Sequence, residues 1–236
     1  MLISHQYNFI FIHIYKTAGT SIMNEFVPHS RLIDRLAYQN TLSRLIFGQI
    51  NNLMGWSDDG MKQFTGHHKH AKAHEVEDKM GTKAFSSYYK FSFVRNPFDL
   101  IVSKYFYILQ SKKHVSHKKV LNMSFLDFLK WHLSKKPPLQ IDFLMNQHRD
   151  RKLVDYIGRF ENLTEDTSKI KKNLGLEVSN GIEHRNPSLN RKSKNYQDYY
   201  DDESKSLVSN YFQLDLELLG YNYDGAQGDM KLITQY

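Results

Sequence analysis

The feature that most constrains the fold is an apolar run at residues 7–15, Tyr-Asn-Phe-Ile-Phe-Ile-His-Ile-Tyr, which ends at a turn of small and hydroxylated residues. A run rich in β-branched and aromatic residues is typical of a strand covered on both faces, as in a parallel sheet. The turn, residues 16–21, contains one lysine and three hydroxyl side chains, and a helical pattern begins at Ser21. This order predicts an anion site, because free backbone N–H groups and the positive end of the helix dipole meet there. An ordinary connection that happens to contain Lys16 is the alternative.

The order of residues in this turn differs from that of the loop that binds nucleoside triphosphates. That loop reads G-x-x-x-x-G-K-[ST], with the lysine after the second glycine. Here Lys16 precedes Gly19, and no earlier glycine stands where the first one is required. The turn is therefore shorter than one that wraps a β-phosphate, and it suits a smaller terminal anion.

A second strand and helix follow the same plan. Residues 88–94, Tyr-Tyr-Lys-Phe-Ser-Phe-Val, indicate another buried strand, and Arg95 and Pro97 follow it. Proline is favoured at the first position of a helix, and a guanidinium at a strand end can donate two hydrogen bonds to one phosphate. Ser103 lies about two helical turns further on, where its hydroxyl reaches the same anion if the helix passes alongside it. A strand-end charge and a tolerated helix serine are the alternative interpretations.

Together, residues 13–21 and 93–105 closely resemble the two cofactor motifs of sulfotransferases of the family 2 type, the carbohydrate branch found in the Golgi and in bacteria. The similarity continues in the family's order, at residues 147–148, 153–163, 185–188 and 215–221. One departure is Tyr15, which stands where the family usually has proline. The resemblance implies a three-layer α/β fold, related to the P-loop proteins, with helices flanking a mostly parallel central sheet. We expect a third strand at 153–160.

The resemblance also implies a donor and a set of site residues. In this family the first motif holds the 5′-phosphosulfate of 3′-phosphoadenylyl sulfate (PAPS), and the second holds its 3′-phosphate. Transfer of the sulfuryl group to a hydroxyl of a carbohydrate or glycolipid acceptor then needs no metal, because protein charges such as that of Lys16 stabilise the leaving group. The positions that match the family's cofactor contacts are Lys16, Thr17, Ala18, Gly19, Thr20, Ser21, Arg95, Ser103, Asn186 and Ser188.

A cluster of histidines at residues 67–70 supplies the candidates for a catalytic base. It lacks the acidic or cysteine partner and the helical H-x-x-x-H spacing of a zinc site. A neutral imidazole is suited to take the proton of an attacking sugar hydroxyl. In related carbohydrate sulfotransferases a histidine at a helix start is implicated in this role, and His70 matches that placement best, followed by His68 and then His67. Glu75 is a carboxylate alternative, and a solvated loop histidine is the alternative for each of the three.

Length, composition and net charge limit the possible classes of protein. A chain of 236 residues is long enough for one sizeable α/β domain spanning 1–236. Its 32 basic and 25 acidic residues give a net charge of +7, which favours polyanionic ligands. Binding to nucleic acid is not indicated, because the basic residues are scattered and no nucleic-acid-binding motif is present. The absence of cysteine excludes disulfides, and no run is long enough to span a membrane. A cytoplasmic, bacterial enzyme is therefore expected.

Two segments resist assignment to regular structure. Residues 31–64 match no family motif; we expect a variable insertion there, helical over 32–47 and otherwise a loop over the site. Residues 183–200 are polar and contain several basic side chains. The resemblance implies that this loop covers the bound nucleotide, whereas composition alone also allows a solvated connector.

Two functions of other classes stay open at this point. A nucleotide-dependent kinase on a related P-loop scaffold would need ATP and Mg²⁺, and the order of Lys16 and Gly19 argues against it. A non-catalytic relative that kept the nucleotide pocket would tolerate loss of every histidine in 67–70.

Overall fold

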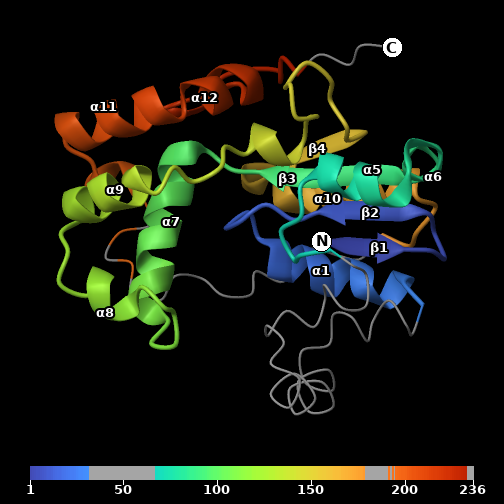
Figure 1. The fold of residues 1–236 in the computed structure, drawn as a ribbon, viewed down its shortest axis with the longest axis horizontal. Coiled ribbons are helices and arrows are strands. Elements are labelled where there is room, and N and C mark those ends of the chain that lie inside the picture. Colours follow the sequence, from blue (N-terminus) through green and yellow to red (C-terminus); the bar gives the residue numbers. More distant parts are fainter. Residues whose placement is uncertain (32–66, 179–190, 192, 194, 233–236) are drawn as a thin grey trace.

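The computed structural model describes residues 1–31, 67–178, 191, 193 and 195–232 of the chain. Among these residues, a four-stranded sheet runs in the order β1-β2-β3-β4, with helices on both sides of it (Figure 1). The strands β2, β3 and β4 are parallel to one another, and β1 is antiparallel to β2. The expected α/β fold with a mostly parallel sheet is therefore confirmed. The strands are β1 (Leu2–Ser4), β2 (Phe9–Ile12), β3 (Tyr89–Val94) and β4 (Tyr156–Arg159).

Strand β2 is buried on both faces, as its composition predicts. Ile10 and Ile12 belong to one hydrophobic cluster, which also contains Val76 of α5 (Ala73–Met80). Phe9 and Phe11 belong to a second cluster, which contains residues of α1 (Gly19–Phe26) and α10 (Leu163–Asn173). Successive side chains of a strand point to opposite faces, so α5 covers one face of the sheet and α1 and α10 cover the other.

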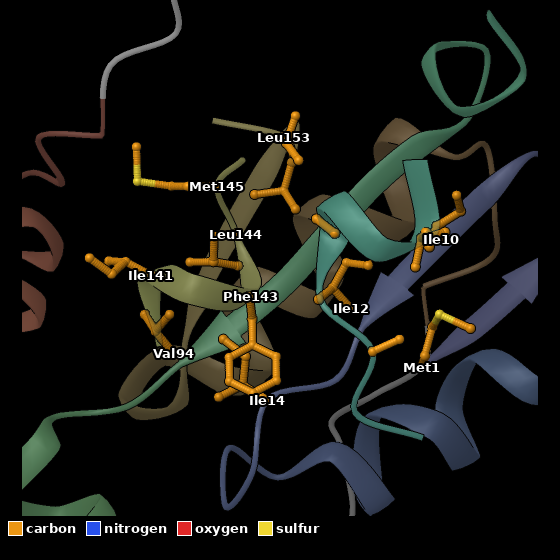
Figure 2. Packing of buried hydrophobic residues seen from close by; sticks show 14 of the residues in the cluster. Met1, Ile10, Ile12, Ile14, Val94, Ile141, Phe143, Leu144, Met145 and Leu153 are labelled. Atoms are coloured by element: carbon orange, nitrogen blue, oxygen red, sulfur yellow. The ribbon is translucent and has the colours of Figure 1, made fainter. Parts of the chain in front are cut away.

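The cluster on the α5 side extends to the ends of the strands. Figure 2 shows Ile12 and Ile14 of the β2 segment and Val94 at the end of β3 together with Phe143 and Leu144. These last two come from the segment around η2 (Ile141–Phe143). The end of the sheet at which β2 and β3 stop is thereby fixed from one side by a rigid apolar layer.

A third group of helices lies to one side of the sheet, around the long helix α7 (Figure 1). The amide of Asn96 precedes α7 as its cap, accepting a hydrogen bond from the Phe98 N–H at 3.0 Å, and Pro97 is the first helical residue as expected. The helices of this group are α7 (Pro97–Gln110), α8 (His117–Val120), α9 (Phe125–Ser134), α11 (Asp202–Tyr211) and α12 (Gln213–Leu219). The remaining short elements are η1 (Val27–His29), α6 (Thr82–Ser86), η3 (Phe160–Asn162), η4 (Tyr196–Tyr199), β5 (Tyr221–Asn222) and β6 (Gly225–Ala226).

Four details differ from expectation or lie beyond it. The antiparallel edge strand β1 was not predicted, and β4 is shorter than the expected 153–160. The insertion expected at 31–64 falls on residues outside the described ranges, apart from Arg31. In the expected covering loop at 183–200, the described residues include a short 3₁₀ helix, η4. No helix of the described residues is both long enough and apolar enough to cross a membrane.

Candidate functional site

The two predicted anion motifs meet at one edge of the sheet. Strands β2 and β3 are parallel neighbours, in register from Phe9 opposite Tyr89 to Ile12 opposite Ser92. Parallel neighbours end at the same edge, where ligands of such sheets bind. The guanidinium of Arg95 donates a hydrogen bond to the backbone carbonyl of Lys16, with an N–O distance of 3.1 Å. Two segments about eighty positions apart in sequence are thus in direct contact.

The turn after β2 has the backbone of an anion site. Lys16 and Ala18 both have positive φ, at 62° and 60°. A non-glycine residue in this conformation costs about 1–2 kcal/mol, a cost that tends to persist where the strained backbone has a function. Ala18 is the residue before α1, and its side chain makes no capping hydrogen bond to the first turn of that helix. The first N–H groups of α1 therefore lack the usual side-chain acceptor and are suited to an anion.

The hydroxyl groups of the turn have different positions. Thr17 is buried, and its Oγ1 donates to the carbonyl of Ile14 at 3.0 Å, which holds the turn against the strand. Ser21 is also buried, whereas Thr20 is exposed. Three hydroxyl groups were expected to bind the sulfuryl donor. That of Thr17 already donates its hydrogen bond within the protein, to Ile14.

Gly19 is required by the ring of His13. A Cβ at position 19 would lie 1.7 Å from Nε2 of His13, a buried residue. We expect Gly19→Ala to displace that ring and to lower the free energy of unfolding by about 1–3 kcal/mol, as overpacking of a core does. Urea denaturation measures this, with Thr20→Ala at the adjacent exposed position as the control. Equal stability of the two variants would show that the turn accommodates a Cβ at position 19 without loss of stability.

Lys16 has its ammonium group 4.0 Å from the ring centroid of Tyr107 on α7. Burial lowers the pKa of Lys16 to about 8, and the positive charges of Arg95 and Lys104 act in the same direction. Among the described residues, no carboxylate forms an ion pair with Lys16. An incoming anion would supply the missing counter-charge.

Arg95 is held firmly at the tip of β3. Its Nε donates to Asp99 at 2.7 Å, and its Cζ lies 3.8 Å from the ring centroid of Phe160. Gln140 accepts from the Arg95 N–H at 2.9 Å and donates to its carbonyl at 2.8 Å. Burial lowers the pKa of Arg95, and Asp99 opposes that effect. The N–H groups on one edge of the guanidinium, which could donate to a phosphate, meet Asp99 in this structure.

A second arginine shares the same carboxylate. Arg191 lies 2.9 Å from Asp99, so Asp99 joins the tip of β3 to the segment that precedes η4. Ser103 is buried on α7. The pairing with Asp99 was not predicted from the sequence, because Arg95 precedes the helix that carries Asp99 and the spacing of ion pairs within one helix does not apply. Asn186 and Ser188 lie outside the described residues.

Of the candidate bases, His70 contacts the segment that leads from β2 into the turn. Its Nδ1 lies 2.8 Å from the carbonyl of His13, and its ring stacks on that of Tyr15 with centroids 3.9 Å apart. A carbonyl only accepts, so Nδ1 carries the proton and the neutral ring keeps its lone pair on Nε2. Burial lowers the pKa of His70 to about 3, against the opposing effect of the hydrogen bond. His68 is exposed and His67 is buried.

A polar hollow of about 440 Å³ is formed by residues close to His70 in the sequence, although His70 itself does not line it. Lys72 and His74, which line it, follow His70 in the chain. Asp142 also lines the hollow, and the ring of the next residue, Phe143, packs edge-on against Tyr15 with centroids 5.6 Å apart. The lining residues are Lys72, His74, Asp142, Asn146, Gln147, His148 and Arg149. No cluster of metal-ligating side chains is present among the residues that the structure describes.

The fold and the site define a class of protein, namely α/β proteins that bind an anionic ligand at the carboxyl edge of a parallel sheet. The chain belongs to the Sulfotransferase family, whose sequence profile matches residues 1–222. Sulfuryl transfer in general is therefore the supported reaction class. A relative from Archaeoglobus fulgidus, described as an uncharacterized protein, is 36% identical over 104 residues, which cover 43% of this chain and 79% of that protein.

Proposed function

We propose that this protein transfers a sulfuryl group from PAPS to a hydroxyl of a carbohydrate or glycolipid acceptor. The observation that carries the proposal is the hydrogen bond from Arg95 to the carbonyl of Lys16, because it brings the two cationic strand ends to one place. PAPS has anionic groups at both ends of one adenosine, and it supplies the sulfuryl group. The uncapped N-terminus of α1 and the cations at the two strand ends fit such a ligand.

In the proposed mechanism each residue acts on one atom of an in-line transfer. His70 accepts the proton of the attacking hydroxyl at Nε2 as that oxygen bonds to sulfur. Lys16 and the backbone N–H groups of the turn neutralise charge on the sulfuryl oxygens and on the departing 5′-phosphate oxygen. Arg95 and Ser103 bind the 3′-phosphate. Arg95 then replaces some of its hydrogen bonds to Asp99 with hydrogen bonds to the phosphate. The other cofactor contacts expected from the sequence stay predictions.

A thermal-shift experiment separates this function from a kinase. We expect 3′-phosphoadenosine 5′-phosphate (PAP), at a hundred-fold excess over its Kd, to raise Tm by about 5–10 °C, and ATP with Mg²⁺ to raise it much less. A larger shift with ATP and Mg²⁺ would favour the kinase. Transfer of labelled sulfate from PAPS to a panel of oligosaccharides in the presence of EDTA then distinguishes an enzyme from a non-catalytic relative. Binding of PAP without transfer to any acceptor would favour the relative.

The lowered pKa of Lys16 predicts the pH dependence of donor use. The ammonium form is the one that binds the donor, and it is lost as the pH rises through about 8. We therefore expect kcat/KM for PAPS, which reports groups of the free enzyme, to fall about tenfold per pH unit above that value. Since the pKa of His70 is lowered to about 3, no acid limb is expected near the ordinary histidine value.

The control for this profile is Lys16→Arg, because a guanidinium stays protonated throughout the range. We expect the alkaline fall to disappear in this variant even if its overall rate is lower. An alkaline fall of the same position in both proteins would assign the titration to another group.

A further inference from the structure

Lys104 is a second lysine at the site, and the proposed mechanism does not use it. It is half-buried on α7, and its ammonium lies 5.4 Å from the ring centroid of Tyr15. The same tyrosine contacts His70, whose ring stacks on it at 3.9 Å. Tyr107 stands three residues further along α7, so it shares a helix face with Lys104. The ammonium of Lys16 lies over the ring of Tyr107. Lys104 therefore belongs to the surroundings of both groups that act in the transfer.

Two buried cations of this protein have carboxylate partners, which the two lysines at the site do not have among the described residues. Arg95 pairs with Asp99 at 2.6 Å, and Lys90 pairs with Asp155 at 2.9 Å. Within the ranges that the structure describes, no carboxylate forms an ion pair with Lys16 or with Lys104. Burial lowers the pKa of both, and the charge of Lys104 adds to the lowering at Lys16. Partly buried charges without partners are unfavourable, and a bound anion would offset that cost at each lysine.

A carboxylate close to this group, that of Glu75, is already engaged elsewhere. Glu75 lies close enough to Tyr15 to raise its pKa, after the larger effect of burial. Its Oε2, however, accepts the backbone N–H of Lys72 at 2.7 Å as part of the cap of α5. Three histidines also lie close enough to feel the charge of Lys104. Burial is the largest cause of the lowered pKa of His70, His114 and His132, and the charge of Lys104 is a smaller cause in the same direction.

We propose that Lys104 binds an anionic group of the acceptor, a carboxylate, sulfate or phosphate close to the hydroxyl that is modified, so that the acceptor is an acidic saccharide. This inference rests on the proposed function. The donor's charges are assigned to the turn at Lys16 and to Arg95, whereas Lys104 lies against Tyr15, which stacks on the base that must face the acceptor. Lys104 is thus a specificity-determining residue, and it selects the acceptor by charge.

The test compares acidic and neutral forms of the same saccharide. The probes are a glucuronate-containing oligosaccharide, its carboxyl-reduced form, and sulfated and phosphorylated forms of the reduced one. Lys104→Met removes the charge and keeps the length of the side chain, and Lys104→Arg restores a charge. Lys112→Met, at an exposed position just beyond α7, is the control for net charge.

We expect the wild type to prefer at least one of the acidic probes, and Lys104→Met to lower kcat/KM on it by about 10–100-fold through KM, as loss of a charged hydrogen bond does. Activity on the reduced form should change less than twofold. Lys104→Arg should keep the preference for the acidic probe, and Lys112→Met should match the wild type. Calorimetric binding of the acidic probe to the enzyme–PAP complex should weaken by the same factor in Lys104→Met.

Several results would overturn the inference: equal loss on acidic and neutral probes, no loss on either, or no binding of any acidic probe to the PAP complex. The affinity for PAP itself separates these from failure of the proposed function. If the wild type and Lys104→Met bind PAP equally, the donor site is intact and only the acceptor assignment is in question. If the wild type does not bind PAP, the proposed function fails first.

Discussion

Lys16→Ala is expected to lower kcat for sulfate transfer by about 10³-fold, which is close to abolition. Removal of one donor that stabilises a developing negative charge costs about 10²–10³ in rate, and here the lost group is a full, partly desolvated charge. Burial of this ammonium lowers its pKa to about 8. Single-turnover measurements with saturating PAPS isolate the chemical step from donor binding.

Two features of position 16 make the substitution clean. Alanine and lysine both have a Cβ, so the strain of the positive φ at this residue is nearly the same in the two proteins. Lys16→Met keeps an unbranched side chain next to Tyr107, whose ring the Lys16 ammonium contacts, and removes the charge, so it separates packing from electrostatics. We expect the methionine and alanine variants to be equally impaired. Near-normal turnover in either would remove Lys16 from its proposed role.

His70→Asn is expected to lower kcat by about 10²–10⁴-fold, the usual contribution of a general base. The asparagine amide can still donate to the carbonyl of His13, as Nδ1 of His70 does at 2.8 Å, so the local structure should survive. The lone pair of Nε2 is what the variant loses. The low pKa of the free protein keeps His70 neutral, and the negative charge of the bound donor would raise its pKa toward a value suited to a base.

Parallel substitutions distinguish His70 from the other candidates. His68→Asn at the exposed neighbour and Glu75→Gln at the cap of α5 should change kcat less than about threefold. PAP affinity should stay the same in all three variants, because none of these residues is assigned to the nucleotide. A large loss in His68→Asn with little loss in His70→Asn would transfer the role of base to His68.

The sequence was sufficient for those elements of the fold that depend on local pattern. Strands β2 and β3 were predicted from runs rich in apolar and aromatic residues, and the start of α7 from Pro97 and the residues after it. Strand β1 was missed because it has only three residues, too few to show a period. Its identity as a strand comes from pairing with β2, which is a tertiary contact rather than a local pattern.

The candidate site was predictable in outline but not in its pairings. A strand end that carries a cation can be recognised from sequence, whereas the partner of that cation cannot. The pairing of Arg95 with Asp99 and Arg191 depends on how α7 and a segment near position 191 fold back onto β3. The contact of Gly19 with His13 and the place of Lys104 beside Tyr15 are likewise results of packing.

The most direct test of the central claim is a crystal structure of the protein with PAP. We expect the 5′-phosphate at the turn formed by residues 16–21, within hydrogen-bond distance of the Lys16 ammonium, and the 3′-phosphate beside Arg95 and Ser103. We also expect Nε2 of His70 to face the space next to the 5′-phosphate. Electron density for the nucleotide at another edge of the sheet, or with only one phosphate near these two strand ends, would contradict the claim.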